Sequence, residues 1–534
     1  MRVHTIFRYL EKHPWAIMII AGILLIPALL INLGLNPVFL ASDEAIRGLV
    51  SMEMILSGDY VVPTIQGEMY LKKPPLFNWI LALFFNLFQS HNEFILRLPN
   101  IISIILFGLV IYFSFKSTFG KYKAATLSLI VLTTGRILFW DSFLGLIDIT
   151  FSWLIFLDFM ILYYYFKRGK FWHLFIISYA IITMAFLLKG MPALVFQGLS
   201  LLVVFLAFGK FKKLFSLQHL LGFLFMGLSL GIYYYIYDLR NPGHLSDILF
   251  MLFEQSARRT AIRFGFLAMF MHLFTFPAEV LYHFAPWTIL AVFLFQRNLR
   301  KKINRDPFIK YMALIFIVNI IPYWSSPEVF PRYLFMFIPL LMGILFHLMQ
   351  QTPHKIYRRI IHLFFLVMLS GSILATLAPV FMEYFSFVPH RTAKSLLIAT
   401  LLMLVLALYL KLKPQRFAVV ILALLLVRIS FNWFILPDRH REIQPFKEQA
   451  LKVAGITRGA PLYIYKRSLY QHGMSFYITA ERGDILTVRE EDFDPDAFYT
   501  VNPGYLNGRE YINYLDYQIE WERRNLKLVK FTDR

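Results

Sequence analysis

Cysteine is absent from the sequence, so disulfide bonds, thiolate metal sites and cysteine nucleophiles are excluded. Charged residues are scarce at 16% of the chain, whereas soluble domains have about a quarter. The sequence also lacks a Walker loop and a glycine-rich dinucleotide turn. These absences argue against a soluble, redox-active or nucleotide-binding protein.

Apolar residues make up 58% of the chain and fall into long runs between short basic loops. A helix needs about 20 apolar residues to cross a bilayer core, and its backbone groups are then paired within the segment. We therefore predict an all-α polytopic membrane protein. Its thirteen predicted spans cover residues 15–35, 94–115, 124–140, 144–166, 171–188, 192–208, 218–238, 280–296, 309–325, 332–350, 359–381, 395–410 and 417–436.

The net charge of +21 is concentrated in alternate loops. By the positive-inside rule these loops face the cytoplasm and anionic headgroups, and we expect no nucleic-acid partner. The N-terminus is then cytoplasmic, and the run at 15–35 is too long for a signal-peptide core. The basic loops lie near residues 2–12, 116–123, 167–170, 210–213, 297–305, 355–359 and 411–416.

The tail after the last span changes in composition and becomes more charged. It has β-like runs at 462–465, 497–501, 517–521 and 528–531, and a helix-like stretch at 445–454. We predict a transmembrane catalytic domain at 1–436 and a periplasmic α/β domain at 437–534. The long loop at 239–279 is expected on the same outer side.

The first outer loop, residues 42–90, is the most polar early segment. Ser42 is a good N-cap, and Asp43 and Glu44 fall in the first turn of an amphipathic helix that we expect to lie in the membrane interface. The apolar run at 76–90 is expected to be interfacial or re-entrant. The two acids either complement the helix dipole or take part in chemistry, and local sequence leaves both interpretations open.

Other polar residues are predicted on the same side. Asp148 lies near the outer end of a span, where a carboxylate is costly and usually functional. Lys189 lies at the end of another span. Its side chain either snorkels to the membrane interface or forms part of a site. Arg332 and Tyr333 begin a third span. Carboxylates can activate an acceptor, and cations can stabilise a departing phosphate.

Arginines also gather in the long outer loop, in "FEQSARRTAIRF". Arg258 and Arg259 run against the charge bias of that side and suggest an anionic ligand such as a phosphate. His244, His272 and His283 lack a recognisable metal-ligand spacing. We predict no metal among these residues.

Four segments together resemble the GT-C glycosyltransferases, and among them the aminoarabinose transferases, which are related to protein O-mannosyltransferases. They are "SDEAIRGLVSMEMILSGDYVVPTIQGEMYLKKPPLFNWI", "LGLIDITFSW", "LLKGMPAL" and "FPRYLFMFIPLL". The resemblance implies a GT-C fold and transfer of a sugar from undecaprenyl phosphate at the periplasmic face of a bacterial inner membrane. It suggests 4-amino-4-deoxy-L-arabinose or a related sugar, with lipid A or another envelope molecule as acceptor.

The resemblance also implies roles for individual residues. Asp43 and Asp148 would handle the acceptor, and Lys73 would bind the donor phosphate, with Tyr70 and Tyr333 nearby. Lys72 stands where the family has an acidic residue implied to bind a metal. Because a cation cannot ligate a metal, we predict that the site works without a cofactor, with a divalent metal as the alternative.

Other functions remain open from the sequence. A transporter or flippase of lipid-linked saccharides would also need many spans and a cationic cavity. A protein O-glycosyltransferase would share the donor chemistry but differ in its acceptor. A scaffold in an envelope complex would explain the outer domain and leave Asp148 unexplained.

Overall fold

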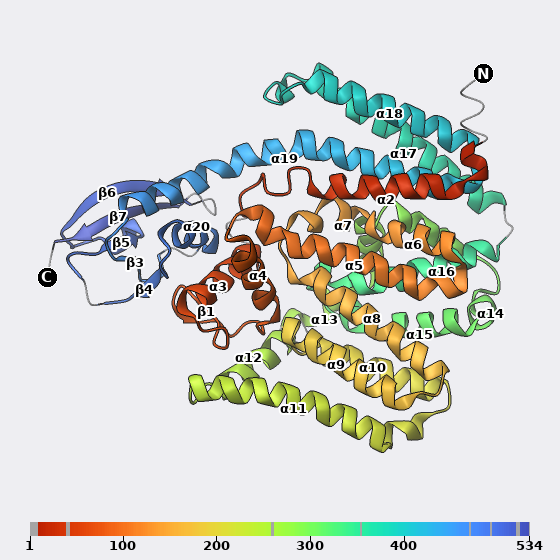
Figure 1. Ribbon diagram of the computed structural model, residues 1–534, viewed down its shortest axis with the longest axis horizontal. Coiled ribbons are helices and arrows are strands. Elements are labelled where there is room, and N and C mark those ends of the chain that lie inside the picture. Colours follow the sequence, from red (N-terminus) through yellow and green to blue (C-terminus); the bar gives the residue numbers. More distant parts are fainter. Residues whose placement is uncertain are drawn as a thin grey trace.

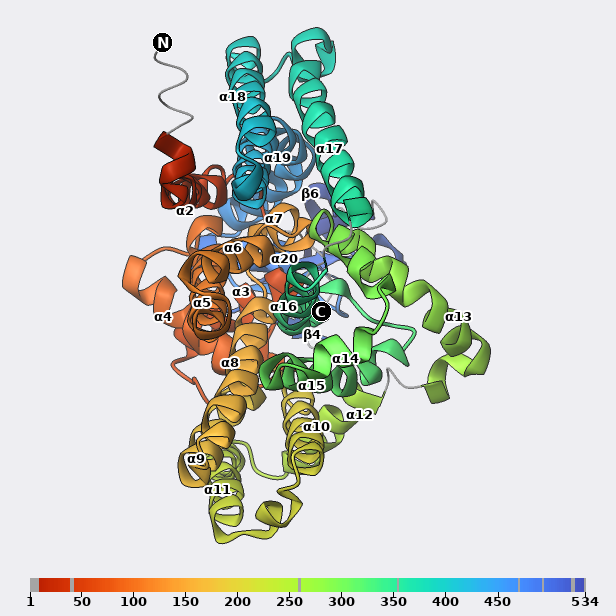
Figure 2. The same cartoon turned by 90° about the vertical axis from the view of Figure 1, so that its right-hand side faces the viewer.

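The computed structural model describes residues 9–38, 43–257, 261–352, 355–468, 471–491, 494–519 and 524–532. Figure 1 shows a helical bundle joined by the long helix α19 to a small sheet at one end. In Figure 2, α17 and α18 lie at one edge of the bundle, and α9, α10 and α11 lie at the opposite edge. The core of the bundle is formed by aliphatic and phenylalanine side chains.

The described residues include ten helices that are long and apolar enough to cross a membrane, or eleven if the bent pair α6 and α7 is one span. They confirm a multi-pass membrane protein but give fewer such helices than the thirteen predicted. The difference comes mainly from α2 (Pro14–Leu30) and α10 (Pro192–Ala207), which are apolar but have 17 and 16 residues. α6 and α7 meet at an angle of 53°.

The remaining helices of the bundle follow the chain in order. They are α5 (Glu93–Phe119), α6 (Lys121–Leu132), α7 (Gly135–Phe139), η1 (Asp141–Phe143), α8 (Ile147–Lys167), α9 (Phe171–Lys189), η2 (Phe211–Phe215), α11 (Leu217–Arg240), α12 (Leu245–Ala257), α13 (Ala261–His283), η3 (Trp287–Phe295), α14 (Leu299–Asn304), α15 (Pro307–Trp324), η4 (Pro331–Phe337), α16 (Ile338–Gln350), α17 (Lys355–Phe381), η5 (Glu383–Phe385), α18 (Arg391–Lys411), η6 (Lys413–Gln415) and α19 (Arg416–Ile456).

One predicted span is misplaced. The span expected at 280–296 is replaced by an apolar helix at Gly265–His283, followed by the 3-10 helix η3. The predicted outer loop at 239–279 therefore contains α12 and most of α13. The apolar run at 265–283 is interrupted by His272, Pro277 and Glu279, so its helix is harder to recognise from the sequence.

The first outer loop is mainly helical and lies on the side of the bundle nearest the C-terminal sheet (Figure 1). The predicted helix is α3 (Asp43–Ser57), and the apolar run after it is α4 (Leu76–Phe88). A short antiparallel pair, β1 (Thr64–Ile65) and β2 (Glu68–Met69), lies between them. Helix α3 packs against α4 and against α20 (His472–Arg482) of the C-terminal region. The predicted N-cap Ser42 lies outside the described residues.

The C-terminal region carries a mixed five-stranded sheet in the order β4-β3-β5-β7-β6. Strand β3 is parallel to both of its neighbours, and β7 is antiparallel to β5 and β6. Helix α19 continues through Pro437 and Pro445, so the predicted boundary and the helix at 445–454 both fall inside it. The strands are β3 (Leu462–Tyr465), β4 (Thr487–Arg489), β5 (Phe498–Val501), β6 (Tyr511–Gln518) and β7 (Asn525–Phe531), with η7 (Pro503–Tyr505) after β5.

Candidate functional site

A buried carboxylate and two cations meet where three elements end. Asp148 lies in the first turn of α8, where a negative charge complements the helix dipole. Its Oδ1 accepts from Lys189 Nζ at 2.5 Å, at the end of α9. Its Oδ2 lies 3.4 Å from Arg332 Nε, at the start of η4. Asp148 and Lys189 are both buried, so neither charge is left unpaired inside the protein.

Arg332 connects this cluster to helix α3. Its Nη2 lies 2.6 Å from Oδ2 of Asp43, the first residue of α3. The Asp43 side chain is 54% exposed, whereas the Asp148 side chain is 4% exposed. One guanidinium therefore bridges an accessible carboxylate at the rim and a buried one beneath it.

Tyr333 forms one wall of the cluster. The Lys189 ammonium lies 4.0 Å from the centroid of the Tyr333 ring and 5.2 Å from that of Phe151. Aromatic faces attract a cation within about 6 Å, and more strongly when water is excluded. Tyr333 is buried, so this ring helps to hold Lys189 against Asp148.

The adjacent lysines of the first outer loop act on different groups. Lys73 is half-buried, and its charge acts on the Asp148 carboxylate. Lys72 is exposed, and its charge acts on His472 at the start of α20. Burial lowers the pKa of His472 to about 4, with Lys72 as the second cause. The charge of Lys73 thus acts on the carboxylate cluster, and that of Lys72 acts on the C-terminal region.

The hydroxyl of Tyr70 is held by Arg47, a residue that was not predicted as part of the site. Arg47 Nη2 donates a hydrogen bond to the Tyr70 hydroxyl, and Nη1 donates to Asn78 Oδ1 at 3.3 Å. Burial raises the pKa of Tyr70, so its hydroxyl stays neutral. Arg47 lies one turn after Asp43 on α3, and this spacing was the available signal for placing both on one face.

Glu44 occupies a different environment from Asp43. Its carboxylate is fully buried and accepts from Arg97 Nε at 2.8 Å and Nη2 at 3.1 Å. Its Oε1 also accepts from the Gly145 backbone N–H at 2.8 Å. A Cβ at Gly145 would lie 2.9 Å from the Leu96 carbonyl oxygen, so this close approach requires glycine. Glu44 therefore ties α3 to α5 and to the segment before Asp148.

Asp141 is a second buried acid beside the cluster, and it was not among the predicted site residues. Its Oδ2 accepts from Arg136 Nε at 2.5 Å. Asp141 interacts electrostatically with Asp148 and Arg332, which places its charge within reach of the site. Its sequence position, in the turn before α8, resembles an ordinary loop acid.

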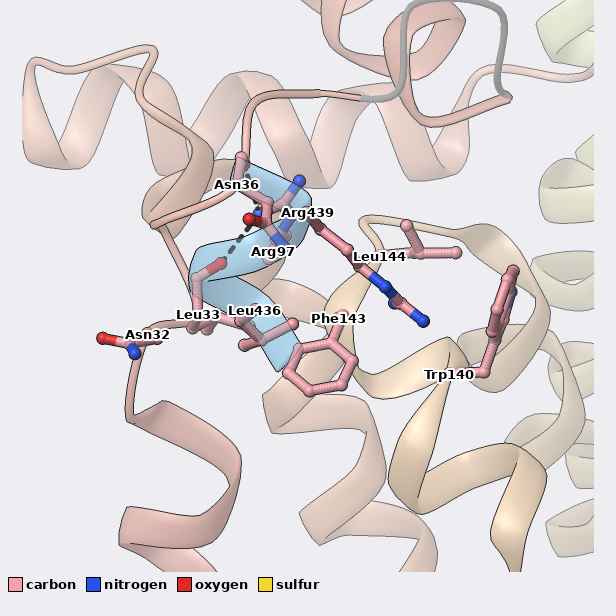
Figure 3. Close-up of a pocket in the computed structure, with 9 residues that line it drawn as sticks. All are labelled: Asn32, Leu33, Asn36, Arg97, Trp140, Phe143, Leu144, Leu436 and Arg439. Carbon is pink, nitrogen blue, oxygen red and sulfur yellow. Dashed lines mark hydrogen bonds between the residues drawn. The ribbon is translucent and has the colours of Figure 1, made fainter. Parts of the chain in front are cut away.

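A small cavity lies next to this region (Figure 3). It has a volume of about 20 Å³, which is room for roughly one water molecule. Arg439 extends between Leu144 and Trp140, while Arg97 donates to the Leu33 carbonyl at 2.8 Å. The cavity is too small for a sugar. Its lining residues pack around the loop that precedes Asp148.

Arg258 and Arg259 lie outside the described residues. Within the described ranges, no three His, Asp or Glu side chains come together as a metal-binding group. The metal-free site therefore stays a prediction.

Comparison with known proteins identifies the fold. Over 97% of this chain and 98% of the other, the structure matches ArnT from Cupriavidus metallidurans bound to undecaprenyl phosphate, with a TM-score of 0.70 and 18% identity. The apo form of that protein matches over the same shares with a TM-score of 0.69. The chain has the GT-C fold, as the sequence resemblance implied.

Sequence comparisons find similarity over part of the chain. Residues 72–237 match the PMT_2 family, described as dolichyl-phosphate-mannose-protein mannosyltransferase. An uncharacterized protein of Aquifex aeolicus (strain VF5) is 25% identical over 321 residues, which cover 58% of this chain. The chain spans 61% of the length of that relative.

Proposed function

We propose that this protein is a membrane glycosyltransferase that moves a sugar from a polyprenyl-phosphate donor to an acceptor at its outer face. The single observation that carries the proposal is the Asp43–Arg332–Asp148–Lys189 cluster, assembled at the ends of three bundle elements and α3. The proposal is also supported by the shared fold with ArnT, whose structure contains undecaprenyl phosphate.

The charges suggest a division of roles. Asp148 is occupied by Lys189 and Arg332 and orients these cations. Asp43 is more exposed and has one cationic partner, so we assign it as the base that receives the acceptor proton. We assign to Lys73, with Arg332, the stabilisation of the leaving phosphate.

In the proposed step the acceptor oxygen or nitrogen forms a bond to the anomeric carbon of the sugar. The bond from that carbon to the phosphate oxygen breaks, and its electron pair leaves with polyprenyl phosphate. The acceptor proton passes to the Asp43 carboxylate. Tyr70 and Tyr333 line the proposed site. Glu44 positions α3 and the segment before Asp148.

The finer assignments are extensions of this proposal. A 4-amino-4-deoxy-L-arabinose donor and a lipid A acceptor would follow from the aminoarabinose-transferase resemblance, and a protein acceptor is the alternative. We place the protein in a bacterial inner membrane, with the N-terminus cytoplasmic and the C-terminal sheet periplasmic. A periplasmic reading from a reporter fused after Arg534 would support this orientation, and a cytoplasmic one would overturn it.

Transport of a lipid-linked saccharide is less well supported. The buried charges within the described spans include Asp158 and Arg428, but both are held in packed surroundings. Asp158 accepts from Ser178 at 2.6 Å, and Arg428 donates to the Ala28 carbonyl at 3.1 Å and to Ser142 at 2.9 Å. These contacts lie between helices and do not form a continuous charged path.

The test is release of polyprenyl phosphate from a labelled polyprenyl-phosphate sugar, with an envelope-lipid extract as the acceptor. The variants are Asp43→Asn and Asp148→Asn, and the control is Asp59→Asn. Asp59 lies in the same outer loop and forms an exposed pair with Arg240 at 3.0 Å. We expect release with the wild type and the control and none with the two site variants. Equal release by all four proteins would contradict the proposal.

A further inference from the structure

A larger cavity lies at the other end of the bundle. It is lined by residues from the end of α16, the first turns of α17, the end of α18 and the start of α19, and its volume is about 300 Å³. Figure 1 shows α17 and α18 reaching the end of the bundle where α2 begins, away from the C-terminal sheet. This cavity is therefore separate from the carboxylate cluster of the outer face.

Three cations surround this cavity, and its described lining contains no acidic residue. They are Arg358 of α17, Lys413 of η6 and Arg416 of α19. None of the three forms an ion pair within the described part of the chain, whereas the cations of the outer cluster are paired with carboxylates. Three like charges around one hollow repel one another, and an anion would relieve that repulsion.

The wall that carries Arg416 is held in place by other residues. Its guanidinium carbon lies 5.0 Å from the ring centroid of the buried Tyr409, and its Nε donates to the Tyr409 carbonyl at 3.3 Å. The Tyr409 hydroxyl pairs with His362 Nδ1 at 3.0 Å. Arg416 is thus held at the cavity before any ligand binds, which lowers the entropy cost of binding.

The floor of the cavity is apolar. Phe365 is buried, and its ring lies 6.2 Å from that of Phe417, with Ile361 one turn before it on α17. A ligand that fits this hollow needs a negatively charged group at the rim and hydrocarbon below it. A soluble anion would satisfy only the first requirement, and an uncharged lipid only the second.

We propose that this cavity binds an anionic glycerophospholipid. Its phosphate lies among Arg358, Lys413 and Arg416, and its glycerol and upper acyl carbons cover Phe365 and Phe417. Basic pockets between spans on the positive side of a membrane protein bind anionic headgroups. The proposal is independent of glycosyl transfer, because it uses none of the residues of the outer cluster.

The experiment compares lipid retention by the full-length protein, purified in detergent and titrated with phosphatidylglycerol, using native mass spectrometry. The test variant is Arg358→Ala/Arg416→Ala. The matched control is Arg300→Ala/Lys301→Ala, which removes the same charge from the exposed helix α14 in another basic loop. The charge-keeping variant Arg358→Lys/Arg416→Lys and thermal unfolding of all proteins check that the fold is intact.

We expect the wild type, the control and the charge-keeping variant to retain one phosphatidylglycerol. Retention by the alanine pair should be weaker by on the order of tenfold to thirtyfold. Equal loss in the alanine pair and the control would reduce the effect to general surface charge and overturn the site. Equal retention of phosphatidylcholine would overturn the anionic headgroup, and displacement by equimolar inorganic phosphate would show a free-anion site instead of a lipid site.

Discussion

Asp43 and Glu44 are neighbours at the start of α3, but their carboxylates lie in opposite environments. Asp43 is 54% exposed and has one cationic partner from another span, Arg332. Glu44 is fully buried and is held by Arg97 and by the backbone N–H of Gly145. A carboxylate that is accessible can exchange a proton with a substrate, and one enclosed by an arginine and an amide holds the structure together.

Lys73 and Lys72 are also neighbours whose charges act on different parts of the molecule. Lys73 acts on Asp148 inside the site, and Lys72 acts on His472 of the C-terminal region. In each pair, adjacent residues of the same charge serve different parts of the molecule. A charged dipeptide at the edge of a membrane domain can therefore support the fold and the chemistry at once.

The largest expected effect separates the two acids by stability. Glu44→Ala leaves Arg97 buried without its carboxylate, and breaking such a pair costs about 3–5 kcal/mol. Asp43→Asn changes a carboxylate that is 54% exposed and leaves Arg332 paired with Asp148, so we expect a smaller loss, nearer the roughly 0–1 kcal/mol that exposed pairs contribute. Thermal unfolding in detergent measures both. A Glu44→Ala protein as stable as Asp43→Asn would remove the distinction.

For activity per folded molecule we expect the opposite order, with the larger loss in the Asp43 variant. General-base catalysis contributes roughly 10²- to 10⁴-fold, so we expect Asp43→Asn to lose at least a hundredfold in transfer rate. Glu44→Gln keeps the shape and can still accept from Gly145, so the fraction that folds should lose less activity. Transfer is measured at equal amounts of monodisperse protein. Comparable loss in both variants would mean that Glu44 also takes part in the reaction.

The lysine pair should show a smaller difference. A charge-assisted contact to phosphate contributes about 1.5–3 kcal/mol, which corresponds to roughly a ten- to hundredfold effect. Lys73→Ala should weaken transfer by that factor, and Lys72→Ala should change it less. The measurement is transfer of a labelled polyprenyl-phosphate sugar by both variants. An equal loss would refute the different roles of the two lysines.

A change in pH should test the electrostatic effect of Lys72 on His472 of the C-terminal region. The pKa of His472 is about 4 in the folded protein, below its ordinary value of 6.5. The unfolded chain therefore binds the proton more readily, and stability is lost as pH falls from 6.5 to 4. By pH 5 the loss should be roughly 1–2 kcal/mol.

Hydrogen exchange in α20 at pH 7.5 and pH 5 measures this effect locally. His472→Gln should remove the additional exchange at pH 5, and Lys72→Ala should reduce it because one cause of the lowered pKa is gone. Lys73→Ala serves as the control with the same change in charge. If Lys73→Ala altered the pH dependence as much as Lys72→Ala, the separation of the two side chains would be refuted.

The smallest expected effect is that of a chelator. Because Lys72 replaces an acidic residue in the resembled family, transfer should stay within about twofold of its starting rate after chelation, far less than the loss expected from removing a phosphate contact. The measurement is the transfer rate before chelation, after chelation and after addition of zinc. Activity lost to the chelator and restored by zinc would establish a metal site.

Much of the fold follows from local sequence. The apolar runs predicted α5, α8 and the other long helices, because a segment in lipid must bury apolar side chains and satisfy its own backbone. The spacing of acids and apolar residues predicted α3. The helix α13 was missed in its true position because His272, Pro277 and Glu279 interrupt its apolar run.

Part of the site was also recognisable from residue types, since Asp148, Lys189 and Arg332 are costly at the ends of spans. The partners of these residues were not recognisable from the sequence. Arg332 is 289 residues from Asp43, and Glu44 is 53 residues from Arg97. Local sequence specifies which segments become helices and where charge is placed at their ends. Which charges meet depends on how the helices pack, because ion pairing acts over a few ångströms.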